Sequence, residues 1–224
     1  MLRGKPVAKK PGKREVVRRL LERHPQSYAD RLRIDVGRNT PAVLYQWLVA
    51  SLLFSARISS NQAEVAARAL FEEGWRTPKK MADVSWAARV EVLNRSGYAR
   101  YDESTSRYIE ETTRLLLETY GGDLRKLRDA AGRDPAQERT LLKKFKGIGE
   151  VGADIFFREA QLAWEELFPF ADQRALKTAQ KLGLGQDAKG LARVVERRDL
   201  PRLLSALIAV DLAKNVGELL EEAG

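Results

Sequence analysis

In residues 145–156, FKGIGEVGADIF, two glycines flank Ile148 between two segments of helical pattern. Glycine at 147 and 149 accepts backbone angles that a side chain would forbid, so the turn can be tight and its amide groups uncovered. Uncovered amides at the N-terminus of a helix bind anions. The stretch therefore predicts two short helices joined by a turn that suits a phosphate group.

The two sides of the turn have a common apolar face and a basic approach. Leu141, Leu142 and Phe145 precede the turn, Val151, Ile155 and Phe156 follow it, and Lys143, Lys144 and Lys146 surround the first helix end. Two packed helices joined in this way form a helix-hairpin-helix, which binds the nucleic-acid backbone without reading its sequence. An ordinary corner, in which the glycines only end one helix and admit the next, is the other interpretation. The residues predicted to contact DNA are Lys146, Gly147, Ile148, Gly149, Val151 and Gly152.

Composition restricts the classes of function. The chain has 224 residues, a formal net charge of +9 and a pI of about 9.8, which suit a polyanionic partner such as nucleic acid. It contains no cysteine and a single histidine, so disulfides, thiol catalysis and metal centres built from cysteine or histidine are excluded. No apolar run approaches the ~20 residues of a membrane span, and no signal peptide follows Met1. We expect a cytoplasmic protein that does not enter membranes, associated with the nucleoid if the source is bacterial or archaeal.

The first residues are strongly basic. Residues 1–19 hold eight lysines and arginines against one acid, Glu15, and prolines and glycines interrupt the first part. This composition predicts a flexible basic arm at residues 1–12. Whether the arm contacts phosphates or is a solvated tail is left open.

The rest of the chain predicts helices and no strand. Thr40 and Pro41 are an N-cap and a first-turn proline, and they open a segment that is apolar nearly all round and should be buried. The apolar spacing predicts helices at 41–55, 61–74, 85–94, 102–119, 123–130, 135–145, 150–166, 173–182, 188–197 and 200–221. The fold class is therefore all-α, with about ten to twelve short helices.

One aspartate downstream of the turn stands out. Asp172 lies in FPFADQRALKTAQKLGL, residues 168–184, directly before a predicted helix. Aspartate is among the best N-caps, so a capping role is expected. A fixed carboxylate can also do chemistry, because cleavage of an N-glycosidic bond builds positive charge on the sugar and a nearby anion stabilises it.

These segments together resemble a known family. LLKKFKGIGEVGAD (141–154) and PFADQRALKTAQKLGL (169–184) resemble the helix-hairpin-helix (HhH-GPD) DNA glycosylase superfamily of base excision repair, and within it the endonuclease III-like enzymes. LVASLLFSARISSNQAEVAARALF (48–71) and GYARYDESTSRYIEETTRLLLETYGGDL (97–124) extend the resemblance, which covers roughly residues 40–184. The family pairs a hairpin with one essential aspartate, which corresponds to Asp172.

The resemblance implies two helical subdomains with a DNA-binding cleft between them. A six-helix barrel carrying the hairpin would span 41–165. A second domain carrying Asp172 would combine 13–40 with 166–224. The implied partner is double-stranded DNA with a lesion or a mismatch, from which the target nucleotide is flipped out. We expect the protein to act as a monomer.

The sequence departs from the family in two ways. In the bifunctional branch a lysine forms a Schiff base, and the matching position is Val151, which cannot be a nucleophile. The expected enzyme is monofunctional, without AP-lyase activity: Asp172 supports departure of the base and positions or deprotonates water. Many members carry a cysteine-bound iron–sulfur cluster, which a chain without cysteine cannot hold. We expect no cofactor, although a monovalent cation on the hairpin carbonyls would leave no trace in the sequence.

Four further side chains lie at positions where contact with a base is considered. Arg57 falls where family members place a side chain that fills the space left by the flipped base, although a surface arginine would look the same. Tyr98 and Tyr101 are candidates to line a base pocket, since aromatic rings stack on bases. Trp47 fits better as a core residue of its apolar helix.

The substrate and two rival functions stay open. Uracil or thymine opposite guanine is the first expectation for the excised base, because some family members without the lysine and the cluster act there. Alkylated purine and adenine opposite oxidised guanine are alternatives. A non-catalytic helix-hairpin-helix DNA-binding protein is the main rival, and a basic helical scaffold is the third possibility.

Overall fold

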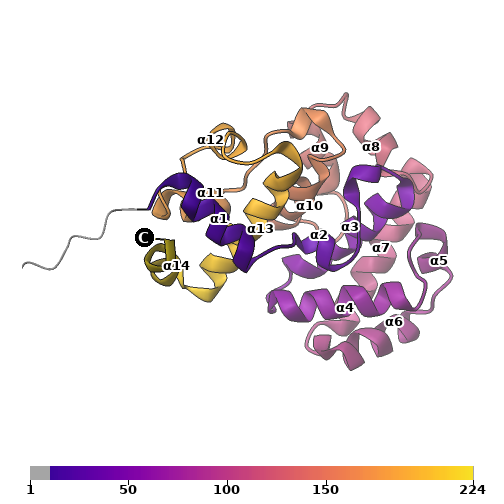
Figure 1. The fold of residues 1–224 in the computed structure, drawn as a ribbon. Coiled ribbons are helices and arrows are strands. Elements are labelled where there is room, and N and C mark those ends of the chain that lie inside the picture. Colours follow the sequence, from indigo (N-terminus) through magenta and orange to yellow (C-terminus); the bar gives the residue numbers. More distant parts are fainter. Residues whose placement is uncertain (1–10, 224) are drawn as a thin grey trace, which may run out of the picture. The chain divides into compact units, whose positions relative to one another are not determined.

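A computed structural model of the chain describes residues 11–223 and shows helices only. Within these residues there is no strand, so the all-α prediction is confirmed (Figure 1). The chain forms two compact units: a larger one, Tyr28–Phe170, and a smaller one whose described residues are 11–27 and 171–223. Of the predicted basic arm, residues 1–10 lie outside the described residues.

The larger unit contains nine α-helices among the described residues. They are α2 (Tyr28–Arg31), α3 (Pro41–Ser55), α4 (Ser60–Glu72), α5 (Pro78–Ala82), α6 (Trp86–Leu93), α7 (Asp102–Tyr120), α8 (Leu124–Ala130), α9 (Pro135–Leu142) and α10 (Glu150–Ala160). The unit also contains three short helical turns: η1 (Val36–Arg38) before α3, η2 (Asn94–Tyr98) before α7 and η3 (Glu165–Leu167) after α10.

Helix α3 is the centre of the larger unit. The Thr40 side chain accepts a hydrogen bond from the Val43 N–H at 3.4 Å, and Pro41 occupies the first turn, as the sequence predicted. The helix packs against α4, α7, α8 and α10, which explains why α3 has apolar residues on nearly all of its sides. Neither α3 nor any other helix in residues 11–223 is long and apolar enough to cross a membrane.

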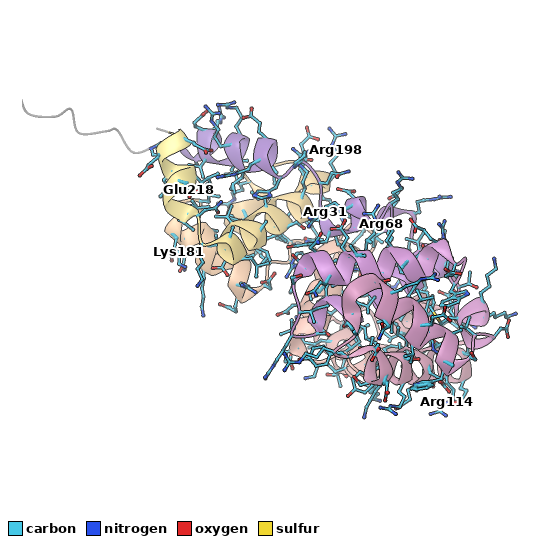
Figure 2. The ribbon with its side chains drawn as sticks, turned by 90° about the horizontal axis from the view of Figure 1, so that it is seen from below. Arg31, Arg68, Arg114, Lys181, Arg198 and Glu218 are labelled. Atoms are coloured by element: carbon cyan, nitrogen blue, oxygen red, sulfur yellow. The ribbon has the colours of Figure 1, made fainter. Side chains whose placement is uncertain are left out.

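Residues 28–40 belong to the larger unit, whereas the resemblance placed them with the chain ends. The Tyr28 ring packs 5.1 Å from the ring of Phe54 on α3. Arg31 and Arg68 both pair with Glu64 on α4, at 3.4 and 2.8 Å, and their side chains lie near each other in Figure 2. These contacts hold α2 on α3 and α4.

The smaller unit packs around α13. Its helices are α1 (Lys13–Arg23), α11 (Gln173–Lys181), α12 (Ala188–Ala192), α13 (Leu200–Ala213) and α14 (Val216–Ala223), with the turn η4 (Arg197–Asp199). Val16, Val17 and Leu20 of α1 are buried, and α1 lies against α13 and α14 (Figure 1). Both ends of the chain therefore contribute to one core.

Several helix ends differ from the predicted ranges. The segment predicted as one helix at 200–221 is interrupted at Lys214, whose φ of 56° is left-handed and ends α13. Helix α10 stops at Ala160, and the next residue, Gln161, uses its side chain to bind the backbone of Phe170, accepting from its N–H at 3.0 Å and donating to its carbonyl at 3.2 Å. The pattern at 188–197 is helical only to Ala192. Helices α1, α2 and α5 were not predicted.

Candidate nucleic-acid interface

The turn between α9 and α10 is anchored by two apolar side chains. Phe145 and Ile148 are buried, and the Ile148 N–H donates to the Phe145 carbonyl at 3.0 Å, which closes a tight turn. Between and after these anchors the chain returns to the surface, since Lys146 and Gly149 are exposed. The hairpin predicted from the sequence is thus present, with its turn at the surface of the larger unit.

The glycines of the hairpin serve different purposes. Gly147 has φ +84°, and a Cβ there would lie 3.1 Å from side-chain atoms of both Leu52 and Tyr108, so backbone angle and space both demand glycine. At Gly152 a Cβ would lie 3.3 Å from Ile148, which lets α10 approach the turn closely. Gly149 has an ordinary extended conformation and open space around it. A side chain at 149 would therefore fit.

The N-terminus of α10 is uncapped. Gly149 is the N-cap residue and provides no side-chain hydrogen bond to the first turn of the helix. The first amides of a helix have no partner inside it, and together with the helix dipole they attract anions. Val151, in this first turn, is 61% exposed, so the surface around the amides is accessible. The geometry offers N–H donors to a ligand from outside.

Ion pairs connect the two hairpin helices. Arg139 on α9 pairs with Glu150 at 3.1 Å and with Asp154 at 2.7 Å, and Lys143 also binds Glu150. The hydrogen bond from Lys143 is the main reason that the pKa of Glu150 lies below its usual value. Lys143 is therefore engaged within the hairpin. Lys144 is exposed and the Lys146 ammonium lies 5.7 Å from the centre of the Tyr108 ring, so these two lysines are better placed for a phosphate.

Two hydroxyl groups contact the carbonyls of the turn. Thr112 Oγ1 on α7 donates to the Lys146 carbonyl at 3.0 Å. Ser55 Oγ at the end of α3 lies 2.7 Å from the Leu52 carbonyl of its own helix and 3.2 Å from the Gly147 carbonyl. Neither residue was predicted to belong to the site. Tyr108 and Thr112 are four residues apart on one helix face, which the sequence does show. What that face contacts is visible only in the folded chain.

The loop that carries Arg57 lies next to the hairpin. Arg57 is exposed in the connection between α3 and α4, two residues after Ser55. Ser55 contacts the turn through the Gly147 carbonyl, and its Cβ lies 3.6 Å from the position that a Cβ on Gly152 would take. The structure thus brings Arg57 and the hairpin, far apart in sequence, into one region of the larger unit.

The aromatic candidates divide into buried and accessible rings. Tyr98 is 1% exposed, its hydroxyl donates to the Leu53 carbonyl at 3.3 Å, and burial raises the pKa of Tyr98 to about 12. Trp47 is buried as well, and its Nε1–H donates to the Phe156 carbonyl at 3.1 Å. Tyr101 is half-buried, with the Arg100 guanidinium 5.4 Å from its ring centre. Of these three rings, only that of Tyr101 is partly accessible.

Asp172 caps a helix in the smaller unit. Its Oδ1 accepts hydrogen bonds from the N–H groups of Arg174 and Ala175, both at 3.1 Å, at the start of α11. The side chain is 5% exposed. The capping role expected from the sequence is therefore present, and it holds the carboxylate in one orientation.

The first hairpin helix contains a buried acid. Glu138 on α9 is fully buried and lies near the carboxylate of Glu166, which pairs with Arg128. Burial raises the pKa of Glu138 to about 8, and Glu166 adds to the effect. The protonated form of Glu138 is therefore favoured in the folded protein. The unfolded chain loses this proton near pH 4.5, so the group's contribution to stability falls as pH rises from there to about 8.

The described residues do not suggest a metal centre. In residues 11–223 no three histidine, cysteine, aspartate or glutamate side chains gather as a metal ion would require. A cluster held by cysteine thiolates does not fit a chain that has no cysteine.

Comparison with known proteins identifies the fold. No protein-family model and no curated protein matches the chain. A solved structure of endonuclease III in a non-covalent complex with DNA has a TM-score of 0.53 and 17% identity, with 95% of this chain and 96% of that chain covered. A trapped covalent endonuclease III–DNA intermediate, the estranged-adenine complex, has a TM-score of 0.51 and 18% identity, with 88% and 83% covered. The chain therefore has the endonuclease III fold over nearly its whole length.

Proposed function

We propose that this protein is a monofunctional DNA glycosylase of base excision repair, which binds double-stranded DNA and hydrolyses the N-glycosidic bond of a damaged or mismatched base. The observation that carries the proposal is the uncapped, accessible N-terminus of α10 at the Gly147–Gly149 turn. It occurs in a chain with the fold of an enzyme whose solved structures are complexes with DNA.

The hairpin would hold the DNA strand. Its open amide N–H groups would donate hydrogen bonds to a phosphate oxygen, and the ammonium groups of Lys144 and Lys146 would add positive charge beside them. Such contacts fix the position of the strand without reading its sequence. Arg57, exposed in the loop that follows Ser55, would contact the duplex beside the hairpin and occupy the space of a flipped nucleotide. The net charge of +9 strengthens the attraction.

Asp172 would support the chemical step. When the bond between C1′ and the base nitrogen breaks, its electron pair leaves with the base and positive charge develops on the sugar. A carboxylate held by two backbone N–H groups stabilises that charge. The oxygen of a water molecule then bonds to C1′, and its proton passes by way of the carboxylate to solvent or to the released base.

The side chain at position 151 would determine the product. Val151 occupies the position that matches the Schiff-base lysine of the bifunctional branch, and a valine side chain cannot form a covalent intermediate with the sugar. The product would be an intact strand with an abasic site. Uracil or thymine opposite guanine is the first substrate proposed, followed by alkylated purine and by adenine opposite oxidised guanine.

Base release from end-labelled duplexes tests the proposal. A panel with uracil, mismatched thymine, alkylated and oxidised bases would be incubated with the protein and with Asp172→Asn, then divided into samples with and without alkali. We expect strand cutting only after alkali, and a loss of roughly 10²- to 10³-fold in Asp172→Asn. Cutting without alkali would contradict the monofunctional assignment.

A non-catalytic DNA-binding protein is the second candidate. The observation that favours it is the N-cap of α11, since capping alone explains an aspartate at 172. On this reading the protein binds duplexes with an affinity that falls steeply with salt, yet releases no base from any member of the panel.

A further inference from the structure

We propose that Thr112, assisted by Ser55, is a positioning residue that turns the peptide groups of the hairpin so that the Gly147 N–H faces a bound phosphate. The inference deepens the proposed function and rests on it. It assigns a role to two hydroxyl groups on α7 and α3, helices outside the hairpin itself.

The direction of the Gly147 amide follows from the Thr112 hydrogen bond. Thr112 Oγ1 donates to the Lys146 carbonyl at 3.0 Å, so this carbonyl points toward α7. In a trans peptide the N–H of the next residue points the opposite way, which directs the Gly147 N–H away from α7. Within residues 11–223 no group accepts a hydrogen bond from this N–H. The donor is therefore left for a ligand.

The turn needs such a constraint because glycine leaves its peptides free to rotate. Residues 147 and 149 lack side chains, and a flip of the 146–147 peptide would replace an outward N–H by an outward carbonyl, which repels a phosphate. The next peptide is held mainly by its Ile148 N–H, which donates to the Phe145 carbonyl at 3.0 Å. Ser55 Oγ lies 3.2 Å from the Gly147 carbonyl and 2.7 Å from the Leu52 carbonyl, so it makes a secondary contact there. The Thr112 hydrogen bond to the Lys146 carbonyl is thus the main side-chain constraint on the turn.

The hydroxyl groups of Thr112 and its neighbour Thr113 bind different partners. Both Thr112 and Thr113 are buried on α7. The Thr113 hydroxyl binds the Ile109 carbonyl of its own helix and the Tyr45 hydroxyl, both at 2.6 Å, and does not reach the turn. The Thr112 hydroxyl instead reaches across to the hairpin. Tyr108, one turn earlier on α7, contacts Lys146 and limits the space at Gly147, so α7 holds both residues of this peptide.

Three substitutions distinguish a role of Thr112 in positioning the turn from a role in stability. Thr112→Val removes the hydroxyl and keeps the shape, Thr112→Ser keeps the hydroxyl, and Thr113→Val makes the same chemical change one residue away. Affinity for an undamaged duplex and the single-turnover rate of base release at saturating protein would be measured with the unfolding midpoint. Thr112→Val should lose about tenfold in affinity with an unchanged saturated rate, as expected for one hydrogen bond to a charged group. Thr112→Ser and Thr113→Val should bind like the parent protein.

The outcomes distinguish this inference from the proposed function. If the parent protein binds duplex DNA and Thr112→Val binds equally well, the positioning role is wrong while the proposed function stands. If the parent protein binds no duplex, the proposed function fails, and the Gly147 amide signal in NMR during titration with inorganic phosphate decides the inference. A shift in the parent protein and in Thr113→Val that is lost in Thr112→Val supports it, and equal behaviour in all three overturns it.

Discussion

Two helices of this molecule begin in opposite ways. In the larger unit α10 begins at Gly149, which leaves the first amides without a side-chain acceptor. In the smaller unit α11 begins at Asp172, whose Oδ1 accepts from two of the first amides. The backbone feature is the same, and one side chain decides whether the helix end is open or closed. An open end suits an anion from outside, while a closed end holds an anion of its own in a fixed orientation.

Charged side chains near both helix ends take part in ion pairs. At the open end Glu150 stands in the first turn, but Lys143 and Arg139 both pair with it and offset its charge. At the closed end Arg174, two residues after Asp172, pairs with Asp211 at 2.6 Å. The negative charge of Glu150 beside the amides of α10 is thus partly offset, and two backbone N–H groups help to hold Asp172 in place.

A capping side chain at Gly149, which would close the N-terminus of α10, should have the largest effect. The conformation of Gly149 is extended and no atom lies within 4 Å of a Cβ built there, so Gly149→Asp fits without strain. The new carboxylate would cap α10, compete for its amides and repel phosphate. We expect affinity for duplex DNA to fall at least about tenfold, since hydrogen bonds to a charged group are lost. Titration of a labelled duplex at fixed salt measures this loss.

The matched control for this change is Gly149→Ala. It adds a side chain of no charge and leaves the amides open, so affinity should stay within about twofold of the parent protein. Chemical denaturation would show whether Gly149→Asp keeps its stability. A Gly149→Asp variant that is folded and binds DNA as tightly as the parent protein would remove the open helix end from the binding site.

Removing the cap of α11 at Asp172 should have an intermediate effect. The quantity that changes is the stability of the protein. Asp172→Ala deletes the acceptor of two N–H groups and should lower the free energy of unfolding by about 1 kcal/mol, whereas Asp172→Asn caps almost as well as aspartate and should cost little. Urea denaturation measures both. Asp187→Ala, at the N-cap of α12 where Oδ1 binds the Gly190 N–H at 2.6 Å, is the control for losing a cap in the same unit. Equal stability of Asp172→Ala and Asp172→Asn would mean that the cap contributes nothing.

Neutralising Glu150, the acid in the first turn of α10, should have the smallest effect. Glu150→Gln removes a negative charge beside the amides and releases Lys143, so affinity for DNA should rise about two- to threefold. The dependence of affinity on salt should become steeper, with a slope larger by up to about 1, because a freed lysine can displace one more counterion. Glu72→Gln, an exposed acid at the end of α4, should change neither quantity. A weaker affinity for Glu150→Gln would show that the ion pairs of Glu150 hold the hairpin in its binding conformation.

Local sequence signals were sufficient where the cause of the structure is local. The start of α3 at Pro41 and the cap of α11 at Asp172 were predicted because capping depends on a few neighbouring residues. The Gly-x-Gly turn was predicted for the same reason. By contrast, the break at Lys214 has no glycine or proline to mark it, and α5 is too short for its apolar spacing to show.

The candidate site was predictable only in part. The sequence indicated the hairpin and Arg57 but did not indicate Thr112 or Ser55, since a buried hydroxyl in a helix usually binds its own helix. Tyr98 and Tyr101 looked alike as aromatic residues near one loop. Their difference in exposure, with Tyr98 in the core and Tyr101 half-buried, depends on packing against α3.

The order of the residues was enough to predict that the chain is helical, where most of its helices begin, that a glycine turn separates two of them, and that no cysteine chemistry is available. These properties follow from residue type and short-range spacing. Long-range packing, in contrast, determines that residues 28–40 lie with the larger unit and that Thr112 of α7 and Ser55 of α3 contact the carbonyls of the turn. Such contacts join residues as much as 92 positions apart, and their formation depends on how the buried faces of several helices fit together.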